Sequence, residues 1–339
     1  MVSFKSNGMK RIHPDALQPQ LRWLILTDNQ IEEMPKEIGR CVILQKCMLS
    51  GNSLRSLPDE ISNCTNLELI RLASNQLQEP PMALLKLPNL NWVALSENPF
   101  LSGVAPVSSD APSLPTLTDP ALQQEGEILG KGASGVTRQV TWNKRPVAVK
   151  TYLGTMTSDG NPQQEKHLSL TASTIQSPCL IQVLGQTPNG SLVMELLQNY
   201  QTLAGPPSME SCSRDVYETD QQLTEEQADC MVTGLVEVLR ELHDRSITHG
   251  DFYGHNILVS QDDPRKVKLS DFGAAFFYDR NAEYGKYVEQ IEMRAFGVLV
   301  GEIASLLPSG SALAAKLKEL KTKCRELETF ASLCQARQQ

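Results

Sequence analysis

The sequence contains no apolar run of about 18 residues, the length that a membrane-spanning helix needs. It has no secretory signal-peptide pattern, and Val2 stands where N-myristoylation requires glycine. Its eight cysteines show no C-x-x-C spacing, and several occupy periodic apolar positions, so we expect buried free thiols rather than disulfides. The net charge of -8 disfavours nucleic acid or an anionic membrane as the main partner. These absences together predict a cytoplasmic protein.

The length and composition indicate two globular domains. A chain of 339 residues is too long for one ordinary domain and suits two. An apolar fraction of 40% and a charged fraction of 21% are typical of soluble folded protein rather than disorder.

The first hundred residues repeat with a step of 23 residues. The positions that recur are Asn29, Asn52, Asn75 and Asn98, then Leu21, Leu44, Leu67 and Leu90, then Leu26, Leu49, Leu72 and Leu95, and Pro35, Pro58 and Pro81. A partial earlier unit is visible at Phe4, Asn7, Met9, Ile12 and Leu17. No such unit buries its apolar face alone, so the neighbours are expected to stack.

This pattern resembles a leucine-rich repeat, and the resemblance implies an α/β solenoid over residues 1–100, with about four repeats and a partial first one. Repeats of this type read protein partners or substrates with the concave strand face. The side chains expected there fall in two rows, Trp23, Lys46, Leu69 and Trp92, and Ile25, Met48, Arg71 and Ala94. Trp23 and Trp92 suit either a protein-binding surface or packing against the neighbouring domain.

Residues 101–124 are rich in proline, serine and threonine, and this composition is typical of a linker. We place the domain boundary there, so that residues 125–339 form the second domain.

The second domain carries short motifs in a fixed order. The first is G-x-G-x-x-G, with its glycines at Gly130, Gly132 and Gly135, and alone it fits a flexible turn or a dinucleotide loop equally well. Residues 147–150 then predict a buried strand that ends in Lys150.

The most specific segment is His249-Gly250-Asp251, with Asn256 five residues after the aspartate. This spacing supplies a carboxylate to orient an acceptor hydroxyl and an amide to bind metal. Fifteen residues later stands Asp271-Phe272-Gly273, whose aspartate suits a metal that bridges phosphates.

In this order the motifs resemble a protein kinase domain of the tyrosine-kinase-like group, with an α+β two-lobed fold. The resemblance implies ATP and Mg as cofactors, Asp251 and Lys150 as catalytic residues with Glu165 as the partner of Lys150, and Asn256 and Asp271 as metal ligands. It also implies that ATP contacts Gly130, Gly132, Gly135, Ala148, Lys150, Met194, Glu195, Leu197 and Leu258. A helix over Thr224–Asp244, the start of a central helix at Arg294–Leu299 and a helical tail over Leu317–Gln335 fit the same fold.

The domain departs from the family pattern in several places. Gly250 stands where the family usually has the arginine before the catalytic aspartate. Tyr253 stands two residues after that aspartate, where serine/threonine kinases place a lysine. His255 stands where tyrosine kinases commonly carry arginine. The A-P-E motif and its R-P partner motif are both missing, and Glu292 replaces the usual aspartate of the central helix.

The motifs favour phosphoryl transfer to protein, with serine or threonine as acceptor. Two alternatives stay open. One is a pseudokinase scaffold that binds nucleotide and a partner protein. The other is a small-molecule kinase of the aminoglycoside-phosphotransferase type, because that class also shares the His-Gly-Asp triplet and lacks the A-P-E motif.

Overall fold

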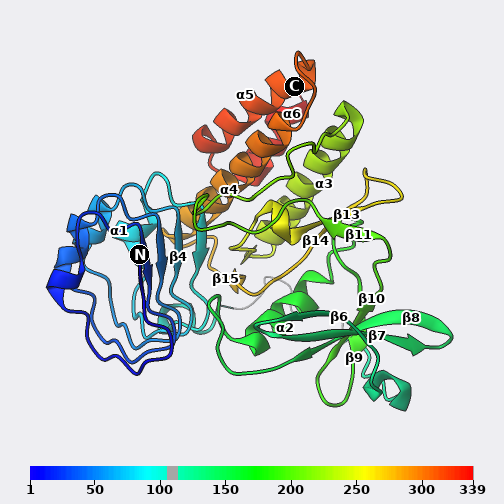
Figure 1. Cartoon of the computed structure of the whole chain (residues 1–339), viewed down its shortest axis with the longest axis horizontal. Coiled ribbons are helices and arrows are strands. Elements are labelled where there is room, and N and C mark those ends of the chain that lie inside the picture. The colour runs from blue at the N-terminus through cyan, green and yellow to red at the C-terminus, as the bar shows by residue number, and fades with distance from the viewer. Residues whose placement is uncertain (105–113, 339) are drawn as a thin grey trace.

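The repeats form one parallel sheet of five strands, with one strand from each repeat (Figure 1). The computed structural model describes residues 1–104 and 114–338. The strands in spatial order are β1 (Val2–Ser3), β2 (Trp23–Ile25), β3 (Lys46–Met48), β4 (Leu69–Arg71) and β5 (Trp92–Ala94). Trp23 aligns with Lys46, Lys46 with Leu69, and Leu69 with Trp92, so the row that the 23-residue step predicts is present. We call the face that carries these side chains the outer sheet face.

The repeated asparagines stabilise the turn after each strand. The Asn52 amide donates to the carbonyls of Leu49 at 2.8 Å and Leu26 at 2.9 Å, and its oxygen accepts from the Ile31 amide at 3.0 Å. Buried backbone groups therefore find partners where the chain leaves the sheet. Short helical turns close each repeat, namely η1 (Pro14–Ala16), η2 (Lys36–Arg40), η3 (Asp59–Asn63), α1 (Met82–Leu85) and η4 (Pro99–Leu101).

The next lobe of the chain is a five-stranded antiparallel sheet with one helix. In spatial order its strands are β6 (Glu127–Gly132), β7 (Gly135–Trp142), β8 (Arg145–Tyr152), β10 (Leu192–Glu195) and β9 (Val183–Gln186). The short turn η5 (Pro120–Gln123) precedes the sheet, and helix α2 (Pro162–Ala172) packs beside β8. The predicted linker, residues 101–124, lies partly outside the described residues, so its extent stays a prediction.

The third part is mainly helical. Its helices are α3 (Glu225–Asp244), α4 (Gly285–Ser305), α5 (Ala312–Glu326) and α6 (Phe330–Gln338), with the turn η6 (Gly254–Asn256). Its short strands are β11 (Tyr200–Thr202), β12 (Ile247–Thr248), β13 (Ile257–Ser260), β14 (Val267–Leu269) and β15 (Phe276–Phe277). Helix α3 begins after Thr224, whose side chain forms a capping box with Gln227, because this pair satisfies two free backbone amides.

The prediction for the central helix was wrong in its start. We expected it to begin at Arg294, but α4 begins nine residues earlier, at Gly285. The added turns carry Val288 and Ile291, which are buried in the core of the repeats. Contact with the repeats therefore extends the helix at its N-terminal end, upstream of Arg294.

The repeats pack directly against the helical lobe (Figure 1). Phe276, Tyr278 and Tyr284 join the apolar core of the repeats, while Leu69 and Trp92 join the core of the helical lobe. Arg214 adds an ion pair to Glu68 at 2.7 Å. Of the two interpretations of the tryptophans, packing on the neighbouring domain therefore holds for Trp92, which is 1% exposed.

All eight cysteines are free thiols, as expected, and five of them are buried. Within the described residues, no helix combines the length and apolar character that crossing a membrane requires.

Candidate functional site

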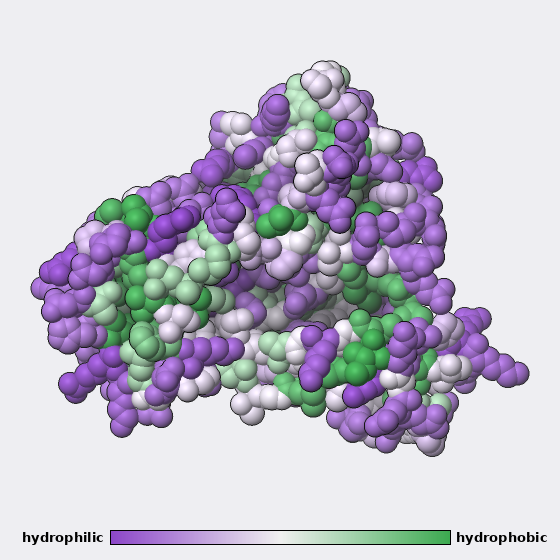
Figure 2. Space-filling model, in the orientation of Figure 1, coloured by the Kyte–Doolittle hydropathy of each residue, from purple (hydrophilic) through white to green (hydrophobic). Residues whose placement is uncertain are grey.

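A cleft of about 480 Å³ lies between the small sheet and the helical lobe. Figure 2 shows the surface hollowed between these two parts, with apolar residues beside the hollow. The predicted residues that line the cleft are Ala148, Lys150, Glu165, Met194, Glu195, Leu197, Leu258 and Asp271. Segments more than one hundred residues apart thus contribute to one cavity.

Further lining residues were not singled out from the sequence. They include Leu129, Thr137, Leu180, Val183 and Tyr200. For Leu129 of β6 and Thr137 of β7, the signal would have been the alternation of side chains along a strand, which places every second residue on one face.

Lys150 and Glu165 form an ion pair on the small-lobe wall of the cleft, with Glu165 buried and Lys150 partly buried. Strand β8 supplies Lys150, and α2 supplies Glu165 from its first turn, after the N-cap Asn161. Burial raises the pKa of Glu165, and the Lys150 ammonium acts in the opposite direction. A buried carboxylate that lacked this partner would be costly, so the pair holds α2 against the sheet.

The three loop glycines occupy two different environments. A side-chain carbon at Gly130 or Gly132 would meet nothing within 4 Å, so the turn between β6 and β7 is open on that side. A side-chain carbon at Gly135 would lie 2.1 Å from the Thr151 carbonyl oxygen, so only glycine fits there. None of the three glycines lines the cleft itself.

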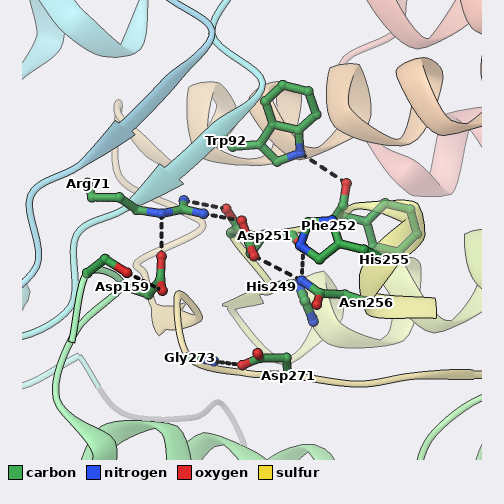
Figure 3. A network of polar contacts seen from close by, with 12 residues as sticks. Arg71, Trp92, Asp159, His249, Asp251, Phe252, His255, Asn256, Asp271 and Gly273 are labelled. Carbon is green, nitrogen blue, oxygen red and sulfur yellow. Dashed lines mark hydrogen bonds and ion pairs between the residues drawn. The ribbon is translucent and has the colours of Figure 1, made fainter. Parts of the chain in front are cut away.

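Asp251 and Asn256 lie together in the loop before β13 (Figure 3). The Asn256 side-chain amide donates to the Asp251 carboxylate and to the Asp251 carbonyl, each at 2.9 Å. The amide therefore fixes the orientation of the carboxylate.

Glu292 of α4 holds the start of the same loop. Its carboxylate accepts from the amides of His249 at 3.0 Å and Gly250 at 2.7 Å, and it pairs with the His243 ring at 2.7 Å. Burial raises the pKa of Glu292, but the His243 hydrogen bond and charge outweigh it and hold the pKa below its ordinary value. The glutamate thus anchors the loop from the helical core.

Asp271 and Asn256 have the donor chemistry of a magnesium site. One Asp271 carboxylate oxygen accepts from the Gly273 amide at 3.0 Å, and the Asn256 amide nitrogen is engaged by Asp251, which leaves the Asn256 amide oxygen for other contacts. Carboxylate and amide oxygens are hard ligands, and magnesium bound with nucleotides commonly takes one or two protein ligands besides phosphate and water. The two residues therefore fit the metal that the motifs imply.

Three hydrogen bonds to this loop were not predicted from the sequence, and all three are donated by side chains of the repeats. The Arg71 guanidinium donates to the Gly250 carbonyl at 2.9 Å and to the Asp251 carboxylate, and it also donates to Asp159 at 2.8 Å (Figure 3). The Trp92 indole donates to the Phe252 carbonyl at 3.0 Å. Both side chains belong to the predicted outer rows, but the repeat pattern carries no signal for what covers those rows.

Comparison with known proteins agrees with this arrangement. Residues 19–77 match the leucine rich repeat family, and residues 123–302 match the protein kinase domain family. The chain is 30% identical over 154 residues to the serine/threonine-protein kinase dst4 of Dictyostelium discoideum, a match that covers 44% of this chain and 29% of that protein. The chain thus aligns with less than a third of the length of this relative. Because the kinase match covers more than half of the chain, the chain belongs to the protein kinase family.

Proposed function

We propose that the chain transfers the γ-phosphoryl group of ATP, with magnesium, to serine or threonine hydroxyls of protein substrates. The observation that carries this proposal is the ion pair between Lys150 and Glu165 on the wall of a cleft that Asp271 also lines. Protein kinase domains in general use ATP and a divalent metal, and the similar Dictyostelium protein is named a serine/threonine kinase.

Each residue of the candidate site would have a separate role. Lys150, held by Glu165, offers a positive charge to nucleotide phosphates, and Asp271 with Asn256 would hold the metal. Asp251, oriented by Asn256, would accept the proton of the acceptor hydroxyl. Magnesium–ATP, when bound, would supply the γ-phosphoryl group, and the magnesium would offset the negative charge of the phosphates. The protein's contribution is then mainly positioning and electrostatic stabilisation.

A second candidate is a nucleotide-binding scaffold that transfers phosphate slowly or not at all. Tyr253 favours it, because it stands where serine/threonine kinases place a lysine and its ring is stacked against Trp92 of the repeats. In either case the partner or substrate is proposed to be a protein that the repeats recruit. On the outer sheet face, Trp23 and Lys46 are partly exposed, whereas Trp92 and Arg71 are covered by the kinase domain.

One assay separates these functions. The purified full chain with radiolabelled ATP and magnesium is tested for autophosphorylation and for transfer to generic serine, threonine and tyrosine peptides. Asp271→Ala is expected to abolish transfer, whereas Asp220→Asn, at an exposed aspartate, leaves it unchanged.

Nucleotide binding without transfer would contradict the kinase proposal and support the scaffold. Label on tyrosine alone would overturn the serine/threonine assignment, and transfer only to small molecules would replace the substrate class.

A further inference from the structure

Arg71 is a buried cation that joins the two domains at the candidate catalytic loop. It lies at the end of β4 on the outer sheet face, and its side chain is 2% exposed. Its guanidinium donates to three groups, Asp159, the Gly250 carbonyl and Asp251. Guanidinium geometry suits such planar, multiple recognition of oxygen acceptors.

The Asp251 carboxylate is divided between two donors. One oxygen accepts from Arg71 and the other from Asn256, and within residues 1–104 and 114–338 these two side chains make all its hydrogen bonds and ion pairs. The titratable or charged groups that face it are Arg71 and Lys46 from the repeats, Asp159 from the segment before α2, and Tyr253, His255 and Asp271 from the helical lobe. Burial raises the pKa of Asp251, and the Arg71 charge opposes that rise.

The loop around Asp251 lacks a cation of its own at the neighbouring positions. Gly250 precedes Asp251, and Tyr253 two residues later lies stacked under Trp92. His255 is turned to Asp215, with 2.7 Å between the ring Nδ1 and the carboxylate. The cation in direct contact with Asp251 therefore comes from the repeats.

Gly250 makes this arrangement possible. Its φ is +73°, and a side-chain carbon would lie 2.6 Å from the Val93 carbonyl of β5 and 2.6 Å from the Ala274 carbonyl. Any larger residue would push the repeats away from the loop. The absence of a side chain at Gly250 therefore lets the repeats approach closely enough for the Arg71 guanidinium to reach Asp251.

We propose that Arg71 is a positioning residue for Asp251, which the repeats supply in place of a cation that the catalytic loop lacks. This inference rests on the proposed phosphoryl transfer. Arg71 fixes one oxygen of the carboxylate, while the other carboxylate oxygen stays oriented by Asn256. The repeats are then part of the active centre as well as a recruiting surface.

Removing the guanidinium has a defined consequence for the geometry of Asp251. The carboxylate would lose the donor to one of its oxygens and would keep only the hydrogen bond from Asn256. We therefore expect kcat to fall while the KM for ATP stays the same, because other residues line the cleft that would hold ATP. A contact that only joined the two domains would not produce this split.

The experiment compares Arg71→Met, Arg71→Lys and the wild-type full chain. Arg55→Met, at an exposed arginine of the repeats, is the matched control. Three quantities are measured, namely kcat, the KM for ATP, and the dissociation constant for magnesium–ATP. The carbon-13 chemical shift of the Asp251 carboxyl is recorded at a single pH as well, because it reports the surroundings of the carboxylate without turnover.

The expected result is a kcat loss in Arg71→Met on the order of tenfold to a hundredfold, below the roughly 100- to 10,000-fold that a general base contributes. Arg71→Lys is expected to recover part of the rate, because it keeps the charge but not the planar fork. If Arg71→Met fails to fold, the kcat and KM of Arg71→Lys decide the question.

Each other outcome has a clear meaning. An active wild type with Arg71→Met equal to the control, or faster, overturns the positioning role and leaves the kinase function intact. An Asp251 carboxyl chemical shift that is the same in Arg71→Met and Arg55→Met overturns it with or without activity. A wild type that binds nucleotide but transfers nothing overturns the proposed function, and with it the positioning role in that reaction.

Discussion

The indole of Trp92 stacks on the ring of Tyr253, with 4.0 Å between ring centroids and 9° between ring planes. One ring comes from the last strand of the repeats, and the other lies two residues after the candidate catalytic aspartate. The Arg214 guanidinium lies over the Trp92 ring, with 5.4 Å between its Cζ atom and the ring centroid. The stack ties the repeats to the loop at which phosphoryl transfer is proposed.

The first prediction concerns this stack. Trp92→Ala is expected to lower the free energy of unfolding by about 3–5 kcal/mol, because it removes a fully buried indole and its hydrogen bond to Phe252. Trp23→Ala, at the partly exposed end of the same row, is the control and should cost clearly less. Urea unfolding of the full chain measures both, and equal losses would contradict a special role for Trp92.

The second prediction concerns the shared core. A fragment of residues 114–339 would expose Phe276, Tyr278 and Ile291, which the repeats bury. It is expected to bind a hydrophobic dye and to lack a cooperative unfolding transition, whereas the full chain unfolds cooperatively. A fragment with the same melting temperature as the full chain would show that the two cores are independent.

The third prediction concerns Gly250. Gly250→Ala is expected to destabilise the chain by about 3 kcal/mol or more, because the new carbon would lie 2.6 Å from two carbonyl oxygens in a left-handed backbone conformation. Gly310→Ala is the matched control, since Gly310 has a φ of +84° but an empty surrounding. It should cost only about 1–2 kcal/mol.

Gly250→Arg, which restores the residue usual in the kinase family, is expected to be worse than Gly250→Ala. Chemical denaturation of the three variants tests the series. A Gly250→Arg chain as stable as the wild type would mean that the repeats and the loop can separate without cost.

The fourth prediction concerns pH. Burial raises the pKa of the Glu302 carboxyl to about 7, although the Tyr217 hydroxyl donates to it at 2.9 Å. Because the folded-state pKa lies above the unfolded one, the protonated form stabilises the fold below about pH 4.5, and this contribution is lost as the pH rises through 7. Other groups that face Glu302 are Asp215, Arg214 and Lys321.

Glu302→Gln removes the charge at every pH. The variant is therefore expected to exceed the wild type in stability at pH 8 by on the order of 1–3 kcal/mol, and to match it at pH 4. Thermal unfolding across this range is the measurement. The same difference at pH 4 and pH 8 would show that the carboxyl does not titrate between them.

The local parts of the fold could be predicted from the sequence because they depend on neighbouring residues. The 23-residue step gives the strand register, since each asparagine and leucine acts within its own repeat or the next. The capping residue Thr224 and the apolar period likewise place α3 within one residue.

The sequence by itself also located the candidate site, because the spacing of Lys150, Asp251, Asn256 and Asp271 is a short-range pattern of chemistry-bearing residues. Tertiary structure alone decided what faces that site. Arg71 lies 180 residues before Asp251, and nothing in a repeat pattern states which surface will cover it. The early start of α4 has the same origin, because burial of Val288 and Ile291 against the repeats, rather than local propensity, stabilises its first turns. Contacts between distant segments depend on how the shapes of two surfaces match, and no stretch of neighbouring residues specifies that match.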